Sequence, residues 1–208
     1  MRGKISAVVA CFVLAACGSS VRATQPAPTT RAVVTTTTTT TTTARRPVAH
    51  HVHHVGTVTA IGDSTMIDAA PSLRSVIPRV VINAAVSRSA LPGPPIISLL
   101  AAARQLGSEV VFALGTNGGL STQLLDRVVH LVAGRRIVMV TNHCAHCGVA
   151  APNNMIIRAY CTRARHCVIA DWDALANAHP TWMTADGVHM PIGGAGAVAY
   201  ARLIRSKL

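Results

Sequence analysis

TVTAIGDS, at residues 57–64, is the stretch that decides the fold of this chain. Its first five residues are β-prone, and apart from two threonines they are apolar, which is typical of a strand covered on both faces. Gly62 permits a tight turn at the end of that strand, and Ser64 then stands where a helix begins. Strand, tight turn and helix in direct succession are the start of a crossover unit that ends in a parallel strand.

The same pattern recurs along the rest of the chain, where short apolar runs alternate with helical patterns. We expect strands at residues 57–61, 79–83, 109–114, 136–141 and 167–170, and helices at 64–76, 95–106, 119–133, 153–164 and 193–206. Strands joined by helical crossovers form a parallel sheet with helices on both faces. The sequence therefore predicts an α/β fold, a three-layer α/β/α sandwich with a five-stranded parallel sheet in the flavodoxin-like order 2-1-3-4-5. The active site of such a sheet lies beyond the carboxyl ends of its strands.

The N-terminus has the composition of an export and anchoring segment. Arg2 and Lys4 precede an apolar run at residues 5–14. The length of this run suits a signal-peptide core and is too short to span a bilayer. The run leads into Leu-Ala-Ala-Cys-Gly, which is similar to a bacterial lipobox with Cys17 as the lipidated residue. We expect residues 1–17 to be a lipoprotein signal peptide and the protein to be extracytoplasmic, anchored to the cell membrane. Plain secretion is the alternative.

Residues 18–55 have a composition that does not favour folding. They combine a Pro/Thr stretch with unbroken threonine at residues 35–43, and too few apolar side chains to offset the entropy of ordering. We expect a disordered Thr/Pro/His-rich tether that leads to a domain at residues 56–208. The tether ends in HHVHH at residues 50–54, which suits Zn²⁺ or Cu²⁺ but has no companion carboxylate or cysteine nearby, so a polar linker end is preferred.

The charge of the chain is strongly positive, with 19 Lys and Arg against 7 Asp and Glu and a net charge of +12. The basic residues are scattered, and the chain has only 2 Trp, 2 Tyr and 2 Phe, so it lacks the aromatic platform on which nucleic-acid bases stack. The charge therefore favours a surface close to anionic envelope polymers or lipid headgroups, and no nucleic-acid partner is expected.

Three polar clusters fall at the edge of the sheet where an active site belongs. The first cluster is GDS, and its last residue, Ser64, stands at a helix N-terminus, where backbone N–H groups favour negative charge. Asn117 stands in LGTNGG at residues 114–119, where its amide suits an oxyanion donor. Asp186 and His189, in DGVH, are spaced so that the carboxylate reaches Nδ1 and leaves Nε2 for a nucleophile. Each cluster alone also has a structural interpretation, as a helix cap, a turn or a chance pair, but their conjunction at one edge favours a Ser-His-Asp triad.

In their order and spacing, GDS, GTNG and DGVH resemble the SGNH (GDSL-type) hydrolases, over about residues 56–208. VFALGTNG, the Asp-Trp at 171–172 and the segment from His-Pro to DGVH at 179–189 are similar to the extracytoplasmic SGNH domain of acyltransferase-3-linked O-acetyltransferases. The resemblance implies that Ser64 is the nucleophile, that His189 is the general base and acid, and that Asp186 orients it.

The resemblance also implies an oxyanion hole made of the Ser64 backbone N–H, the Asn117 side chain and a backbone N–H that follows the second strand. The family usually has glycine at this last position, whereas the corresponding stretch here is NAAVSR at residues 83–88, with Ser87 in the place of the glycine. A backbone N–H survives this change, so Ser87 remains a candidate donor.

The implied reaction is acyl transfer through an acyl-serine intermediate, which needs no metal or organic cofactor. We expect an exported serine esterase that acts on O-acyl esters of the cell envelope, with an acylated envelope glycan or a small ester as substrate. One alternative is an O-acyltransferase onto envelope glycans that works with a separate membrane acyl donor. Another is a catalytically silent SGNH-fold binding lipoprotein.

Four of the 6 cysteines lie in the expected domain, and an even number in an oxidising compartment suggests two disulfides. We predict the pairs Cys144–Cys147 and Cys161–Cys167, because a turn or a short hairpin can bring the Cα atoms of each pair within about 4.4–6.8 Å. A crossed pairing between the two segments is the alternative. The C-x-x-C pair also suits a zinc or redox site, but Cys161 and Cys167 are spaced wrongly for a second zinc knuckle.

Overall fold

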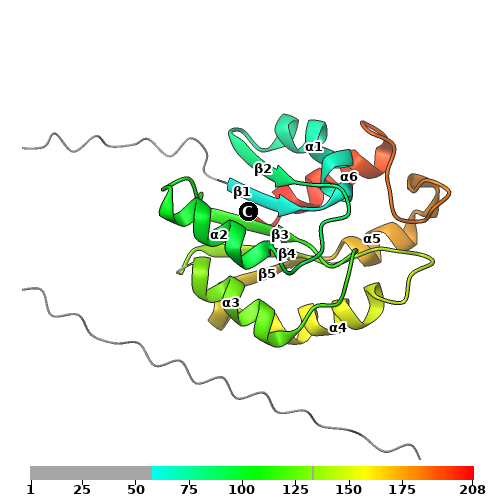
Figure 1. The fold of residues 1–208 in the computed structure, drawn as a ribbon. Coiled ribbons are helices and arrows are strands. Elements are labelled where there is room, and N and C mark those ends of the chain that lie inside the picture. The colour runs from blue at the N-terminus through cyan, green and yellow to red at the C-terminus, as the bar shows by residue number, and fades with distance from the viewer. Residues whose placement is uncertain (1–57, 133) are drawn as a thin grey trace, which may run out of the picture. The chain divides into compact units, whose positions relative to one another are not determined.

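The computed structural model of this chain describes residues 58–132 and 134–208 (Figure 1). The expected signal peptide with Cys17, the tether at 18–55 and its histidine cluster lie outside the described residues. Within the described part of the chain, no helix is both long enough and apolar enough to cross a membrane.

Five parallel strands form the sheet in the order β2-β1-β3-β4-β5, which confirms the predicted order. The strands are β1 (Val58–Gly62), β2 (Val80–Ala84), β3 (Glu109–Ala113), β4 (Arg136–Val140) and β5 (Cys167–Ala170). Gly62, at the end of β1, is level with Ala84 at the end of β2 and with Ala113 at the end of β3. The segments that follow these three strands therefore leave the sheet side by side at one edge.

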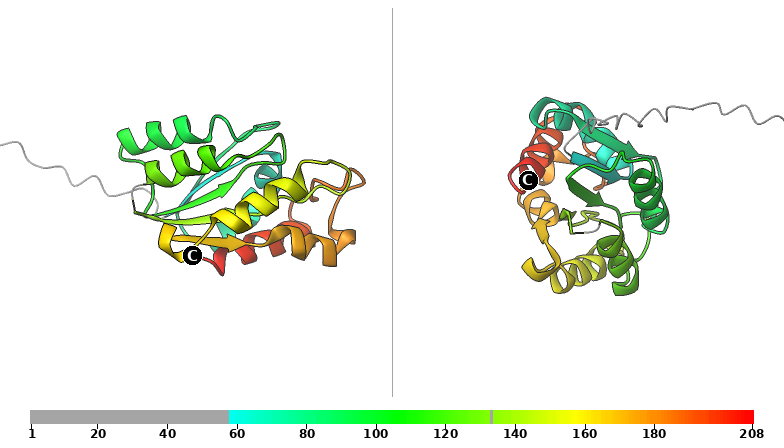
Figure 2. Two further views of the ribbon diagram at one scale, coloured as in Figure 1. Left: turned by 90° about the horizontal axis from the view of Figure 1, so that it is seen from below. Right: turned by 90° about the vertical axis from the view of Figure 1, so that its left-hand side faces the viewer.

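Helices cover both faces of the sheet, so the three-layer sandwich is also confirmed (Figures 1 and 2). The described residues contain α1 (Ser64–Val76), α2 (Gly93–Ala102), α3 (Thr122–Val132), α4 (Ala150–Tyr160), α5 (Trp172–Ala178) and α6 (Ala195–Arg205). One core lies under α1, α5 and α6, where Leu73 and Tyr200 pack with Val111 of β3. The other lies under α2, α3 and α4, where Leu125 packs with Phe112 of the same strand. Alternate residues of β3 thus enter opposite cores.

The bounds of α2 differ from the predicted 95–106. The helix begins earlier because Pro94 and Pro95 lie in its first turn, where the missing N–H groups have no intrahelical partner to lose. It ends earlier because the chain turns after Ala102, where Gln105 donates its N–H to the carbonyl of Leu100. A hydrogen bond of this kind closes a helix end and is not visible in the periodicity of the apolar residues.

Two further differences lie in the C-terminal half. The predicted helix 153–164 is α4, which begins at Ala150 and ends at Tyr160, after which the 3₁₀ helix η1 (Arg163–Arg165) leads into β5. The short helix α5 was not predicted at all. It is capped by Asp171, whose side chain accepts the N–H of Ala174 at 3.3 Å, and it is followed by the 3₁₀ helix η2 (Pro180–Trp182). A helix of this length gives too few turns for a periodic signal.

Both predicted disulfides are present, and the crossed pairing is not formed. Cys144 is bonded to Cys147 in the loop between β4 and α4, and Cys161 is bonded to Cys167, which joins the end of α4 to the start of β5. Because the cysteines of the C-x-x-C pair are bonded to each other, they are not zinc ligands in this structure.

Candidate active site

Ser64 is the first residue of α1 and follows β1 after a single residue. That residue, Asp63, is the helix N-cap and is fully buried, and its Oδ1 accepts the backbone N–H (3.0 Å) and the hydroxyl (2.8 Å) of Thr65. Gly62 packs so closely that an ideal Cβ would lie 2.5 Å from the Cβ of Met66. The turn therefore requires glycine, and it places Ser64 where backbone N–H groups and the helix dipole favour negative charge.

Asp186 and His189 lie in the loop between η2 and α6, and this loop reaches Ser64. The Nδ1 of His189 is 2.7 Å from Oδ2 of Asp186, and the Nε2 of His189 is 2.9 Å from Oγ of Ser64. Carboxylate, imidazole and hydroxyl thus form an unbroken chain of hydrogen bonds. Met190 donates its backbone N–H to the carboxylate of Asp68 at 3.2 Å, which ties this loop to the helix that carries Ser64.

The Asp186 carboxylate divides its two oxygens between its own loop and the imidazole. Oδ1 accepts the hydroxyl of Thr184 (2.7 Å) and the backbone N–H groups of Val188 (2.8 Å) and His189 (3.0 Å), which leaves Oδ2 for Nδ1 of His189. The backbone N–H and side chain of His189, together with the Thr184 hydroxyl, hold the pKa of Asp186 well below its ordinary value. The carboxylate therefore remains ionised and fixes the tautomer of the imidazole.

Asn117 lies in the turn after β3, beside the residue that precedes the nucleophile candidate. Its Nδ2 is 3.4 Å from Oδ2 of Asp63 and 3.4 Å from the carbonyl oxygen of Arg88. The turn needs glycine on both sides of the asparagine, since Gly115 and Gly118 have φ values of 135° and 147°. Burial raises the pKa of Asp63, and hydrogen bonds from Thr65 and Thr116 oppose that rise.

The Asn117 turn is held by hydrogen bonds from a residue of α4 that was not predicted from the sequence. Asn153 of α4 is buried, and its Nδ2 donates to the carbonyl oxygens of Gly115 (2.8 Å) and Gly118 (2.9 Å). Its Oδ1 accepts the backbone N–H of Leu120 at 2.7 Å. The one signal in the sequence is a pair of asparagines, Asn153 and Asn154, among the apolar residues of the helix.

Ser87 lies in the turn after β2, at the same edge of the sheet, and has a φ of 55°. A left-handed conformation of this kind suits the glycine that the family usually has there.

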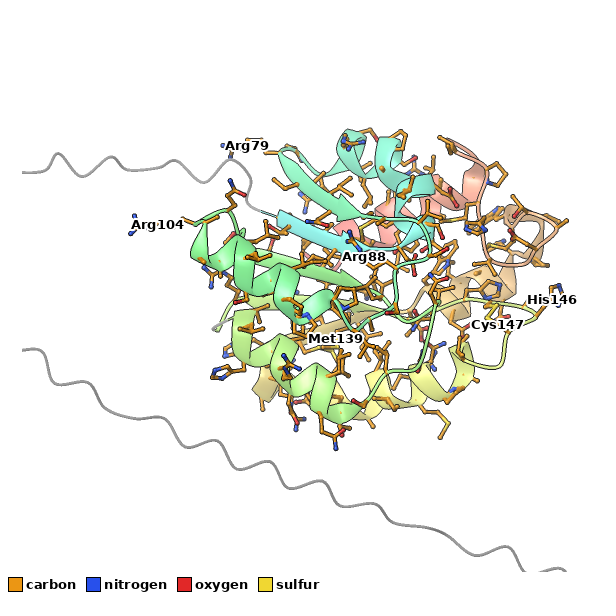
Figure 3. The ribbon with its side chains drawn as sticks, viewed as in Figure 1. Arg79, Arg88, Arg104, Met139, His146 and Cys147 are labelled. Atoms are coloured by element: carbon orange, nitrogen blue, oxygen red, sulfur yellow. A yellow bond between two sulfur atoms is a disulfide. The ribbon has the colours of Figure 1, made fainter. Side chains whose placement is uncertain are left out.

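The next residue, Arg88, was not predicted from the sequence as a site residue (Figure 3). Its Nη1 donates to the carbonyl oxygen (2.7 Å) and Oδ1 (2.9 Å) of Asn83 and to the carbonyl oxygen of Gly62 (3.3 Å), so it joins the ends of β1 and β2.

The structure therefore brings Ser64, Asp186 and His189 into contact, places Asn117 next to Asp63, and places Ser87 in the adjoining turn. Among the described residues, no group of three or more His, Cys, Asp or Glu side chains is arranged to hold a metal ion. The arrangement is suited to proton transfer between a hydroxyl and an imidazole at a helix N-terminus, which is the chemistry of acyl transfer.

Comparisons with known proteins agree on one class. No family model matches the sequence. The chain is 26% identical to peptidoglycan O-acetyltransferase OatA of Listeria monocytogenes serovar 1/2a over 147 residues, and this alignment covers 71% of this chain and 23% of that protein. The structure of this chain is similar to the C-terminal catalytic domain of peptidoglycan O-acetyltransferase A from Streptococcus pneumoniae, which was solved with a methylsulfonyl adduct. The TM-score is 0.67, with 26% identity over 75% of this chain and 94% of that one.

A GDSL-like lipase from Bacteroides thetaiotaomicron shares the fold, with a TM-score of 0.54 and 14% identity over 72% of this chain and 85% of that one. The described domain therefore has the fold of SGNH-type esterase and acyltransferase domains. Within this class the chain is a homologue of peptidoglycan O-acetyltransferases of the OatA type. It spans only 22% to 23% of the length of the curated relatives it matches.

Proposed function

We propose that this chain is an exported serine esterase that acts on O-acyl esters of the cell envelope through an acyl-serine intermediate. The observation that carries the proposal is the hydrogen-bond chain from Asp186 through His189 to Ser64, with distances of 2.7 and 2.9 Å. The choice of an envelope ester is supported by the names of the relatives, which are peptidoglycan O-acetyltransferases.

In the first half-reaction, Oγ of Ser64 attacks the carbonyl carbon of the ester while Nε2 of His189 takes the hydroxyl proton. The ionised Asp186 stabilises the imidazolium that forms. The bond between the carbonyl carbon and the alcohol oxygen then breaks, and Nε2 gives its proton to that oxygen, so the alcohol leaves and Ser64 carries the acyl group. In the second half-reaction, water attacks the acyl carbonyl, loses a proton to Nε2, and the proton returns to Oγ of Ser64 as the acid leaves.

The negative charge that develops on the carbonyl oxygen requires donors at this edge of the sheet. We assign three: the backbone N–H of Ser64, the side-chain Nδ2 of Asn117 and the backbone N–H of Ser87. The first belongs to the opening turn of α1, where N–H groups have no partner inside the helix. Fixed donors in such a hole commonly contribute about 2.7–4 kcal/mol each to the stabilisation of the transition state.

Export and anchoring are part of the proposal. The two disulfides fit an oxidising compartment, because disulfides persist mainly outside the cytosol. The lipobox-like sequence at Cys17 then accounts for attachment to the outer face of the cell membrane, with residues 18–55 as the tether. The natural substrate in this position is an acylated envelope glycan or a small ester.

The second candidate is an O-acyltransferase, and the names of the relatives favour it. In this role the acyl group would come from a membrane acyl donor. The first half-reaction would be the same, and a glycan hydroxyl would replace water in the second. The assembled triad argues against the third candidate, a silent binding lipoprotein.

Turnover of p-nitrophenyl esters of graded acyl length, with and without a peptidoglycan fragment as acceptor, tests the proposal. For an esterase we expect steady release of p-nitrophenol that the acceptor does not accelerate, whereas a transferase is accelerated and yields an acylated glycan. An inert protein that also fails to react with a fluorophosphonate probe would contradict both candidates. The Ser64→Ala variant is the control for background hydrolysis.

A further inference from the structure

A loop closed by a disulfide lies against the loop that carries the Asp/His pair. Ala145, between Cys144 and Cys147, donates its backbone N–H to the carbonyl oxygen of Gly187 at 2.9 Å. Gly187 stands between Asp186 and His189 in the chain. We propose that the Cys144–Cys147 loop is a brace that positions His189 for proton transfer to and from Ser64. This inference rests on the proposed function of the triad.

The contact between the two loops is close as well as polar. Gly187 has a φ of 67°, and an ideal Cβ on it would lie 2.6 Å from the Cβ of Ala145 and 3.3 Å from Cδ2 of His146. Glycine is therefore needed at this point for two reasons, its conformation and the approach of the brace. His146 and Cys147 lie at the tip of the loop, on the side of the molecule where the segment before α6 passes (Figure 3).

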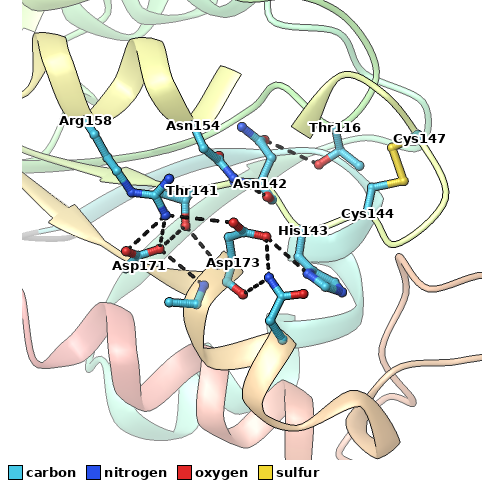
Figure 4. A network of polar contacts seen from close by, with 12 residues as sticks. Thr116, Thr141, Asn142, His143, Cys144, Cys147, Asn154, Arg158, Asp171 and Asp173 are labelled. Atoms are coloured by element: carbon cyan, nitrogen blue, oxygen red, sulfur yellow. Dashed lines mark hydrogen bonds and ion pairs between the residues drawn. A yellow bond between two sulfur atoms is a disulfide. The ribbon is translucent and has the colours of Figure 1, made fainter. Parts of the chain in front are cut away.

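The base of the brace is fixed to two helices (Figure 4). Asn142, which is buried, exchanges two hydrogen bonds with Asn154 of α4: its N–H donates to Oδ1 at 2.7 Å, and its carbonyl accepts from Nδ2 at 2.8 Å. His143, also buried, has its Nδ1 3.3 Å from a carboxylate oxygen of Asp173 in α5. The disulfide then closes the exposed end of a loop whose base cannot shift freely.

The loop that carries Asp186 and His189 holds its internal shape through its own hydrogen bonds, and Met183 and Met190 pack against the core under α1, α5 and α6. The N–H of Thr184 donates to the carbonyl of His189 (2.8 Å), and the N–H of Gly187 donates to the carbonyl of Thr184 (2.9 Å). A pocket of about 300 Å³, open to solvent, lies between this loop, the Cys144–Cys147 loop and α5. At its edge the two loops are joined by the hydrogen bond and the close contact between Ala145 and Gly187.

Removal of the brace should change the reaction step more than binding. A displacement of about 1 Å in a catalytic group can lower the rate about 100-fold, while the pocket for the ester stays the same. We therefore expect the double variant Cys144→Ala/Cys147→Ala to lose about 10- to 100-fold in kcat on a p-nitrophenyl ester, with KM changed by less than about threefold.

The chain contains a matched control, because Cys161→Ala/Cys167→Ala removes a disulfide of similarly short separation that joins α4 to β5. Both double variants should lose thermal stability, but only the first should lose kcat. The downfield NMR resonance of the proton between Nδ1 of His189 and Asp186 should weaken or shift in the first and persist in the second. Equal kcat for the two double variants, with the resonance intact in both, would overturn the brace.

A second pair of variants decides the matter if the Cys144→Ala/Cys147→Ala protein does not fold. Ala145→Pro keeps the disulfide and removes the N–H that binds Gly187, whereas Ala145→Gly keeps both. We expect the kcat loss and the altered resonance for proline alone, and unaltered values for both would overturn the brace. If the wild-type protein has no esterase activity, the proposed function fails, and the resonance of His189 still tests the brace by itself.

Discussion

Asp186 keeps its charge down to acid pH, because three donors from its own loop bind Oδ1 and its pKa lies well below the ordinary value of about 3.9. The carboxyl takes up a proton only at lower pH than a free aspartate does. We therefore expect the Asp186 carboxyl to add no inflection to the pH profile of kcat/KM on an ester above about pH 4, the ordinary range of an aspartate. An inflection above that pH that disappears in Asp186→Asn would contradict the assigned role.

Ser87 offers a test at a single backbone angle. With a φ of 55° it occupies a conformation that glycine adopts freely, so Ser87→Gly should keep the backbone N–H, relieve strain and raise stability by up to about 1 kcal/mol. Ser87→Val should lower stability by about 1–3 kcal/mol, because a β-branched residue is disfavoured there. Thermal melting and kcat/KM measure both effects. Loss of activity in the glycine variant would show that the Ser87 hydroxyl, and not its N–H, is required.

The three residues that the structure joins by hydrogen bonds could be picked out from local sequence patterns. Ser64 follows a strand after a single residue, and Asp186 lies three residues before His189, so a turn is enough to join the carboxylate to the imidazole. Arg88 and Asn153 could not be predicted in the same way. Their partners are carbonyl groups of segments distant in sequence, and those contacts exist only once the strands are in register.

At the scale of elements, α4 supports two of the loops at the edge of the sheet. Asn153 holds the turn that carries Asn117, and the next residue, Asn154, holds the base of the brace. Both side chains are buried, and both replace the water that would otherwise bind the loop carbonyls. One helix thus holds two neighbouring loops in position at this edge of the sheet.

Substitution of Asn153 tests this role of α4. Asn153→Ala leaves two carbonyl groups and one N–H without their partner, so we expect a loss of about 2–3 kcal/mol in the free energy of unfolding and a fall in kcat/KM. Met155→Ala is the matched control, because Met155 lies on the same helix with 72% of its surface exposed and should change stability by less than about 0.5 kcal/mol. Equal stability of the two variants would contradict the account.

The strands and their order could be predicted because each buried strand is a short apolar run and helical crossovers constrain the topology. The ends of α2 and α4 and the whole of α5 could not. They depend on hydrogen bonds that close a helix end and on the cap at Asp171, which periodicity does not report.

At the scale of the whole molecule, the account requires that the domain be held at the membrane by its N-terminus. Cys17 lies outside the described residues, so its role is tested only in cells. We expect Cys17→Ser to abolish lipidation, and the protein to be released to the medium or to remain as an unprocessed precursor. Detergent-phase partitioning and the mass of the N-terminal peptide measure this. Unchanged partitioning together with normal processing would contradict the anchor.

The central claim is that Ser64 carries the acyl group during the reaction. Brief incubation with p-nitrophenyl acetate, an acid quench and mass spectrometry of the peptides test it most directly. The account predicts one acetyl group on the peptide that contains Ser64, no such group in Ser64→Ala, and loss of activity by several orders of magnitude in that variant without unfolding. Acetylation at another residue, or more than about a tenth of wild-type activity in Ser64→Ala, would contradict it.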